Sequence, residues 1–240
     1  MRLDKFLSNS GKGSRKDIKL LLKGGTVSVN GNTVKDPAFK VDENTDTVTV
    51  ENVPIIYKPY IYLMLNKPAG YVSAVFDSKL KTVTELVPME YAHYEVFPIG
   101  RLDIDTEGLI VLTNDGDLCH RVLSPKSHID KTYYVECQNE LTECDVQAFK
   151  DGITLDDGYH TMSASLSIDT DPRKAYLTIQ EGKFHQVKRM MEAVGNKVLY
   201  LKRVKMGDLL LDSSLQLGKI RELTDEEVIL MSQKNKQINK

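Results

Sequence analysis

Five carboxylates lie close together in the segment GRLDIDTEGLIVLTNDGD, residues 100–117. Three of them precede a short apolar run and two follow it: Asp103, Asp105, Glu107, Asp115 and Asp117. Carboxylates at this spacing repel one another and are costly to bury. We therefore expect most of them to contact solvent, to cap a helix or to pair with a cation. At least one is a candidate for chemistry.

This acidic segment fits the common metal-binding and phosphate-binding patterns poorly. DIDTE departs from the D-x-D-x-T of aspartyl-phosphate phosphohydrolases, because Thr106 comes one position early and no apolar strand leads directly into Asp103. An EF-hand needs a later bidentate Glu at an offset that this segment lacks. Neither G-x-x-x-x-G-K-[ST] nor G-x-G-x-x-G occurs, so no nucleotide cofactor is indicated. Metal-dependent phosphoryl transfer stays an alternative, which chelator-sensitive activity would identify.

Two clusters of basic residues occur in a chain that is slightly acidic as a whole. The formal net charge is -2, yet residues 1–25 hold seven basic side chains against two acidic ones, and residues 181–205 hold the same numbers. Either cluster alone is commonly a solvated helix surface. Two of them in one acidic chain indicate a polyanion that is held at defined places, and nucleic acid fits this description.

The composition is that of a globular protein with one large domain or two unequal ones. Of the 240 residues, 41% are hydrophobic and 28% charged. No apolar run approaches the roughly 18 residues of a membrane helix, and MRLDKFLSNSGKGSRKD lacks the apolar stretch of a signal peptide, so we expect a cytoplasmic protein without a membrane partner. The three cysteines are not spaced like a disulfide framework or a set of metal ligands, so we expect them to be reduced. They are Cys119, Cys137 and Cys144.

The start of the chain predicts two short helices. Leu3, Phe6 and Leu7 repeat at helical spacing. Ser14 is the expected N-cap of a second helix, which two glycines at 24–25 should end. The basic residues of the N-terminal cluster therefore fall mainly on these two helices.

A small sheet is expected to follow the helices. TVSVNGNTV has apolar alternation on both sides of Asn-Gly, which favours a hairpin with a type I′ turn, and a strand is expected over 47–50. We assign residues 1–52 to an N-terminal domain and the proline-containing residues 53–59 to a linker. A larger domain should span 60–231, followed by a polar tail at 232–240.

Three features of the N-terminal domain resemble the S-four (alpha-L) RNA-binding domain, which is found in a ribosomal small-subunit protein and in several RNA-modifying enzymes. They are RLDKFL at the start, SR at the opening of the second helix and V-x-V-N-G after it. The resemblance implies binding of structured RNA through phosphates and shape. The implied RNA contacts are Arg2, Lys5, Arg15, Lys16 and Lys19. A surface helix pair without a ligand is the alternative.

The larger domain predicts an α+β fold, a mainly antiparallel mixed sheet with flanking helices. Strands are expected over 60–68, 109–112, 131–136, 161–168, 175–180 and 197–207. Helices are expected over 83–87, 142–150 and 184–194, and after a capping box formed by Thr224 and Glu227. Long βαβ units are absent, which argues against a doubly wound sheet.

Three further segments accompany the acidic one: LNKPAGYV at 65–72, KTYYV at 131–135 and EGKFHQVKRMMEAVGN at 181–196. In this order, behind an S-four-like domain, they resemble the bacterial pseudouridine synthases of the RsuA/RluB/RluE/RluF family over nearly the whole chain. The resemblance implies that a uridine in folded ribosomal RNA is isomerised: its glycosidic bond breaks, the uracil rotates, and the bond re-forms through carbon 5. It implies ribosomal RNA as the partner, and no cofactor or metal. We expect a monomer.

The resemblance also implies roles for individual residues. Asp103, in G-R-L-D, matches the catalytic aspartate, which acts as a nucleophile toward the sugar or the base, or as a base at the sugar. Tyr133, in K-x-Y, would lie against the uracil face and is a candidate for removing the carbon 5 proton; the alternative is a core aromatic. Arg101 would help to extrude the uridine, whose target atom cannot be reached inside a helix. Asp105 and Glu107 are then left to local structure or solvent.

A buried, ionised Asp103 needs a cation within ion-pair distance. The family motif places that cation at the Lys of H-Q-V-K, Lys188. Most members of the wider superfamily carry Arg there, so the bidentate geometry is in doubt. Lys188 lies at the edge of the predicted apolar stripe while Arg189 points away, which makes Arg189 a predicted phosphate contact. The stripe comprises Phe184, Val187, Met191 and Val194.

The same helix bears on which RNA is modified. KFHQVKRM is more similar to the small-subunit members than to the large-subunit ones, which tend to carry an Arg-rich R-N-R-Q/E-V-R-R. We therefore predict isomerisation of a uridine in 16S rRNA. The alternatives are a 23S rRNA synthase of the same family and a non-catalytic rRNA-binding or ribosome-assembly protein. The presence of both Asp103 and Tyr133 favours the enzyme.

Overall fold

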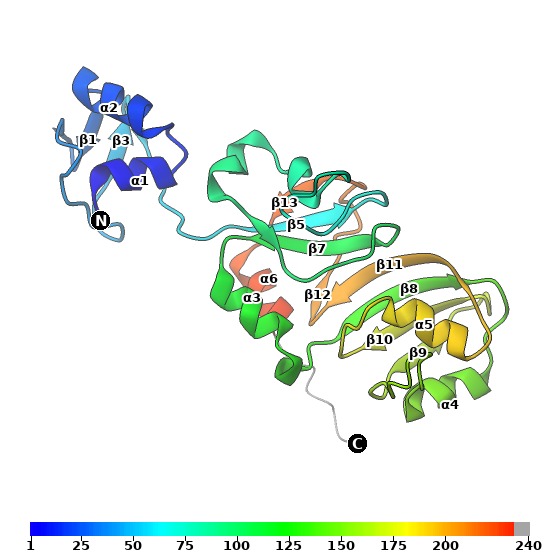
Figure 1. Ribbon diagram of the computed structural model, residues 1–240. Helices are drawn as coiled ribbons and strands as arrows, with labels where there is room; N and C mark the ends of the chain where they lie inside the picture. The colour runs from blue at the N-terminus through cyan, green and yellow to red at the C-terminus, as the bar shows by residue number, and fades with distance from the viewer. Residues whose placement is uncertain (233–240) are drawn as a thin grey trace. The chain divides into compact units, whose positions relative to one another are not determined.

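The computed structural model describes residues 1–232, which form parts of two compact units (Figure 1). Unit 1 comprises residues 1–61 and 87–96, and unit 2 comprises 62–86 and the chain from residue 97 onward. The tail predicted for 232–240 lies outside the described residues apart from its first residue.

The two helices of unit 1 form as predicted. α1 (Leu3–Asn9) and α2 (Arg15–Gly24) pack on each other, and their buried side chains build the core of the unit with the valines of the sheet. The Ser14 side chain and Asp17 form a capping box at the start of α2, and Gly25 ends the helix in the left-handed conformation, with φ 74°.

The sheet of unit 1 has the order β2-β1-β3-β4. Its strands are β1 (Val27–Val29), β2 (Asn32–Thr33), β3 (Val48–Val50) and β4 (Val53–Pro54). The type I′ turn is confirmed, since Asn30 and Gly31 both have positive φ. β4 pairs with β3 beyond residue 52, so the sheet continues into the segment predicted as a linker. The 3-10 helix η2 (Met89–Tyr94) also packs on α1.

Nine strands of residues 1–232 form the mixed sheet of unit 2, on the path β13-β5-β7-β11-β8-β10-β9 with β6 beside β7 and β12 beside β11 (Figure 1). Among these pairs only β7–β11 is parallel. The predicted mainly antiparallel sheet is therefore confirmed. The strands are β5 (Tyr62–Lys67), β6 (Phe97–Pro98), β7 (Glu107–Thr113), β8 (Lys131–Cys137), β9 (Ser165–Ile168), β10 (Lys174–Ile179), β11 (Val198–Met206), β12 (Leu209–Leu210) and β13 (Ile220–Glu222).

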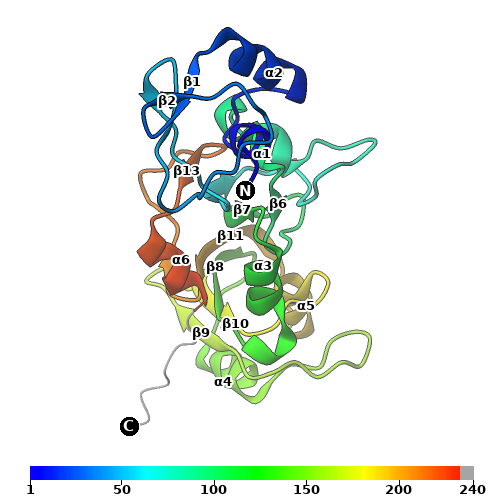
Figure 2. The same ribbon diagram turned by 90° about the vertical axis from the view of Figure 1, so that its left-hand side faces the viewer.

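Helices flank this sheet. α3 (Gly116–Leu123) and α6 (Asp225–Ser232) lie side by side, α4 (Glu143–Asp151) packs on β9, and α5 (Gln186–Ala193) packs on β11 (Figures 1 and 2). Two 3-10 helices complete the unit, η1 (Val83–Leu86) and η3 (Pro125–Ser127). In the described part of the chain, no helix combines the length and apolar character needed to cross a bilayer.

The structure adds α3, which the sequence analysis did not predict. Strand β7 ends at Thr113, and Asp115, two residues later, is the N-cap of α3. Its buried carboxylate accepts hydrogen bonds from the Leu118 N–H at 2.9 Å and from the Tyr62 hydroxyl at 2.8 Å. Asp117 lies in the first turn of the same helix. Two of the five carboxylates therefore stabilise a helix N-terminus.

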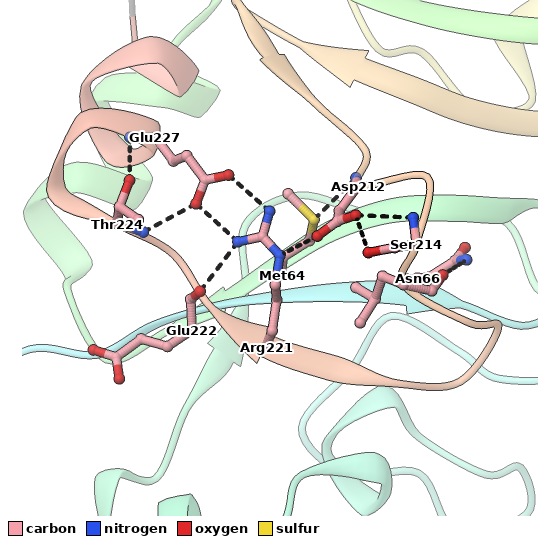
Figure 3. Close-up of polar contacts among 9 residues, drawn as sticks. Met64, Asn66, Asp212, Ser214, Arg221, Glu222, Thr224 and Glu227 are labelled. Atoms are coloured by element: carbon pink, nitrogen blue, oxygen red, sulfur yellow. Dashed lines mark hydrogen bonds and ion pairs between the residues drawn. The ribbon is translucent and has the colours of Figure 1, made fainter.

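The predicted capping box of α6 is confirmed (Figure 3). The Thr224 N–H donates to Glu227 at 3.0 Å, and the Glu227 N–H donates to the Thr224 hydroxyl at 3.2 Å. Arg221 on β13 binds Glu227 through two N–H groups, at 2.7 and 2.8 Å, and binds Asp212 through Nε at 2.7 Å. This network fixes β13, and with it the edge of β5, against α6.

Gly108 allows β7 and β11 to run in parallel at the sheet centre. The backbone of Gly108 has φ +100°, and a Cβ there would lie 2.2 Å from the carbonyl oxygen of Arg203. Only glycine tolerates both the conformation and the approach. The glycine of D-T-E-G-L thus fixes the strand that directly follows the Asp103 loop.

Candidate active site

Asp103 lies in the loop between β6 and β7, next to the start of α5. Its side chain is 27% exposed, and its carboxylate lies 3.5 Å from Nζ of Lys188 and 3.7 Å from Nε2 of His185. The structure therefore brings Asp103 and Lys188 within ion-pair distance. His185 adds a second nitrogen, which lies nearest the other oxygen of the carboxylate.

Lys188 makes its shorter contact with Asp105. The Nζ atom lies 2.6 Å from the Asp105 carboxylate. Burial opposes ionisation of Asp105, but the hydrogen bond and the charge of Lys188 outweigh it, so the pKa of Asp105 lies below its usual value. The expectation that Asp105 belongs to local structure or solvent is incomplete, because this carboxylate shares the cation of Asp103.

α5 begins two residues later than predicted. His185 adopts the left-handed conformation, with φ 49°, so Phe184 lies outside the helix, is 76% exposed and stacks on the His185 ring at 3.8 Å. The prediction that Phe184 belongs to the apolar stripe is therefore wrong. The buried face of α5 also differs from the predicted stripe. The buried side chains of α5 are Gln186, Val187, Met190 and Met191.

Gln186 was not predicted as a site residue, yet it holds the loop before α5. Its side-chain oxygen accepts the Lys183 N–H at 2.9 Å, and its amide nitrogen donates to Glu181 at 2.8 Å. A polar side chain that is buried needs such partners. These bonds fix the position of His185, which lies next to Asp103.

A cavity beside Asp103 is lined by Tyr133 and Arg101. Tyr133 is a buried residue of β8, and Arg101 is an exposed residue of the loop that carries Asp103. The other lining side chains are of two kinds: Leu102, Ile179, Val187 and Leu201 are apolar, and Thr106, Lys183, His185 and Gln186 are polar. A cavity that combines apolar side chains, an aromatic ring and a carboxylate can hold a planar base beside a reactive group.

Comparison with known protein families decides what this cavity belongs to. Residues 61–193 match the family model described as RNA pseudouridylate synthase, and residues 1–46 match that of the S4 domain, the S-four domain of the sequence analysis. The chain belongs to the RNA pseudouridylate synthase family. The predicted family is confirmed.

Relatives of this synthase match it over nearly their whole length. It is 48% identical to an uncharacterized RNA pseudouridine synthase of Bacillus subtilis over 97% of this chain and 99% of that protein. It is 38% identical to the ribosomal small subunit pseudouridine synthase A of Escherichia coli over 95% of this chain and 98% of that protein. A crystal structure of a pseudouridylate synthase is 36% identical, with a TM-score of 0.68 over 96% of this chain and 99% of that one. The predicted fold is confirmed.

In this synthase, Lys67 binds the loop that carries Asp103. Lys67 was not among the predicted site residues. It ends β5 and is completely buried. Its Nζ donates to the carbonyl oxygens of Asp103 at 3.1 Å and Thr106 at 2.8 Å, and also to those of Pro68 and Ile104. Burial lowers the pKa of Lys67 to about 8, against the opposing charges of Asp105, Asp103 and Glu107.

The rest of LNKPAGYV and the serine after it bind the same loop. Ser73 receives the Leu102 N–H at 2.9 Å and donates its hydroxyl to the Leu102 carbonyl at 3.0 Å. The Gly70 N–H donates to the carbonyl of Ile104 at 2.7 Å. The segment LNKPAGYV, with the serine that follows it, therefore helps to position the loop that carries Asp103.

Replacing Lys67 with Met should lower turnover of the synthase about 10²-fold, because a shift of about 1 Å at a reacting group has this cost. The melting temperature should change little, since the lost hydrogen bonds are offset by removal of a buried charge. Single-turnover kinetics and thermal unfolding measure the two effects. Lys79→Met, at an exposed lysine, is the control. Full activity in Lys67→Met would show that the loop keeps its position without this side chain.

Glu107 and Arg189 have partners of their own. The Glu107 carboxylate accepts the Tyr200 hydroxyl at 2.7 Å, so its assignment to local structure agrees with the geometry. Arg189 lies 2.5 Å from Asp156 and 2.7 Å from Asp157. These two carboxylates compete with any phosphate for its guanidinium group, and the phosphate contact of Arg189 stays a prediction.

The basic residues predicted to bind RNA lie on the surface of unit 1, and all five are exposed. Arg2 differs from the others, because Asp4 binds its guanidinium group at 2.7 Å. Asp4 therefore competes with any phosphate at that position. The stronger candidates for RNA contact are Lys5, Arg15, Lys16 and Lys19.

The acidic segment does not form a metal site of the usual kind. Within residues 1–232, no group of three or more His, Cys, Asp or Glu side chains could hold a metal ion. Cys119, Cys137 and Cys144 are free cysteines, and burial raises the pKa of Cys137 to about 11. Asp103, Asp105, Glu107 and Asp115 instead contact cations, hydroxyls and a backbone N–H group of the chain itself.

Proposed function

We propose that this synthase isomerises a uridine of 16S rRNA to pseudouridine, and that it acts as a monomer in the cytoplasm. The observation that carries the proposal is the arrangement of Asp103, next to Lys188 and at a cavity lined by Tyr133. Relatives that bear the name ribosomal small subunit pseudouridine synthase A, 38% to 42% identical, support the small-subunit assignment.

The proposed chemistry assigns one task to each side chain. In the reaction the bond from N1 to the ribose breaks, the bond from carbon 5 to the ribose forms, the carbon 5 proton leaves, and N1 takes up a proton. Asp103 acts as the nucleophile or as the base, and Lys188 places a positive charge 3.5 Å from its carboxylate. Tyr133 lies against the uracil and takes part in removing the proton. The apolar walls exclude water from the detached base.

Arg101 is proposed to help the uridine leave its stack. Extruding a nucleotide costs a few kcal/mol, which contacts with the flipped state must offset. Arg101 is exposed at the rim of the Asp103 cavity, and a planar guanidinium can stack on a base or bind a phosphate there. No cofactor or metal is proposed to take part.

The basic residues of unit 1 are proposed to hold structured RNA. Replacing Lys5, Arg15, Lys16 and Lys19 together with Gln should weaken binding to 16S rRNA and lower the salt dependence of the affinity. Each lost phosphate contact reduces the slope of log affinity against log salt by about 0.7 to 0.9. Filter binding over a range of salt concentrations measures this slope. Gln at Lys79 and Lys219, exposed in unit 2, is the control, and an unchanged slope in the fourfold variant would contradict the assignment.

Tritium release tests the function. Isomerisation liberates the hydrogen of carbon 5, so transcripts labelled there release tritium when the enzyme acts. We expect release from 16S rRNA, either bare or in assembling small subunits. Release from 23S rRNA alone would support the large-subunit alternative. Binding without release from any of these substrates would support the non-catalytic alternative.

A further inference from the structure

A second cavity adjoins the one at Asp103. The two share Arg101, Tyr133 and Lys183 as lining residues. The second extends away from Asp103 toward Lys131 and Arg203. The proposed chemistry uses neither of these two cations.

Arg203 is the first sign that this cavity takes a ligand. Its side chain is 2% exposed, and it lies directly across from Tyr133 in the pairing of β11 with β8. Nε donates to the carbonyl oxygen of Leu109 at 2.7 Å, but Nη2 is buried without a hydrogen-bond partner. A buried guanidinium nitrogen without a partner is costly, and such groups are uncommon unless a ligand or water completes them.

Lys131 is the second sign. It lies on β8 two residues before Tyr133, on the same face of the strand, and donates to the carbonyl of Ile129 at 3.0 Å. Burial and the charge of Arg203 lower the pKa of Lys131 to about 8, against the charges of Asp130 and Glu181. Two cations that repel each other in one cavity form a site for an anion.

The rim of the cavity is apolar and aromatic. Leu123, Tyr159 and Met162 are all exposed large hydrophobic residues and all line it. Lys183 lies over the Tyr159 ring at 4.4 Å, and Glu181 accepts the Tyr159 hydroxyl at 2.7 Å. A fixed aromatic ring beside a cation is suited to an unstacked base.

We propose that this cavity is a second nucleotide subsite, which binds the phosphate and the base of a nucleotide next to the target uridine. The inference rests on the proposed function, because the uridine in the Asp103 cavity carries its neighbours on the same strand. The phosphate neutralises Lys131 and Arg203, and the base packs on Tyr159 and Met162. Unstacked bases beside a target are commonly held in this way.

Phosphate ethylation interference tests the subsite whichever uridine is the target, because it samples every phosphate of the RNA. End-labelled 16S rRNA is ethylated at random phosphates, bound to the protein, and the bound and free fractions are mapped. With wild-type protein we expect ethylation at a phosphate adjacent to the converted uridine to be depleted about tenfold in the bound fraction, the effect of a charged hydrogen bond. In Lys131→Met, used at a concentration that binds the same fraction, this depletion should disappear.

Two matched variants complete the design. Lys131→Arg keeps the charge and should restore the depletion at the same phosphate. Lys79→Met removes an exposed lysine outside the cavity and should leave the pattern of the wild type. An identical pattern in wild type and Lys131→Met would overturn the subsite. Absence of pseudouridine after incubation with the wild type would overturn the proposed function instead, so the two failures are distinguishable.

Thermal unfolding checks that Lys131 carries an unbalanced charge. The proton on Lys131 is held less tightly in the folded protein, so wild-type stability rises as pH increases from about 8 toward 10.5. Below pH 8 the full cost of burying the charge is present. Lys131→Met should therefore melt above the wild type at pH 7, by a difference that shrinks as the pH approaches 10. A large drop in melting temperature at pH 7 would overturn the assignment of Lys131 as a cation that awaits an anion.

Discussion

Replacing Asp103 with Asn should lower conversion of uridine by at least about 10³-fold, while the fold and the affinity for RNA stay near those of the wild type. The amide keeps the size of the carboxylate but cannot act as nucleophile or base. Asp103 is one-quarter exposed and its side chain contacts only Lys188 and His185 among its described ion pairs, so little packing depends on it. Single-turnover kinetics, RNA binding and thermal unfolding give the three readouts.

Asp105→Asn is the matched control for this variant. It should lower the rate less, because Asp105 shares Lys188 but does not line the cavity. Measurable turnover by Asp103→Asn, with deamidation to Asp excluded by mass spectrometry, would remove Asp103 from the chemical step. Equal losses at both positions would instead favour the alternative in which the acidic cluster acts as a unit.

Lys188→Met should lower the rate at neutral pH by about 10²-fold, a loss typical of one missing electrostatic partner at a reacting group. The variant removes the positive charge that lies 3.5 Å from the Asp103 carboxylate. Lys188→Arg keeps the charge and should retain much of the activity. The rate of single turnover for the three proteins measures this effect.

Arg189→Met is the control on the same helix. Its guanidinium group binds Asp156 and Asp157, so the variant should disturb that loop and leave the chemical step near the wild-type rate. If Arg189→Met abolished the chemical step while Lys188→Met was nearly silent, Arg189 would be the functional partner of Asp103. The distances of 3.5 Å and 2.6 Å from Lys188 to the two aspartates would then have no catalytic meaning.

The elements that the sequence predicted well are those determined by short stretches of chain. The N-cap at Ser14, the capping box at Thr224 and the Asn30-Gly31 turn each involve residues within three positions of one another. The same holds for the apolar alternation of the β strands. Local chemistry fixes these elements before any tertiary contact forms, so a single sequence is enough to place them.

The parts that the sequence did not predict depend on contacts between distant segments or on an unusual backbone. Lys67 binds carbonyl groups 36 to 39 residues away, and Lys188 reaches Asp105 across 83 residues. The late start of α5 follows from the positive φ of His185, which few non-glycine residues adopt. A lysine at the end of an otherwise apolar strand, YIYLMLNK, was the available signal for Lys67.

A map of pseudouridines in the rRNA of cells that lack this protein tests the assignment to 16S rRNA most directly. We expect that one pseudouridine of 16S rRNA disappears, that those of 23S rRNA persist, and that the gene for the wild-type protein restores the missing modification while the gene for Asp103→Asn does not. Persistence of every small-subunit pseudouridine in the deletion strain would contradict the assignment.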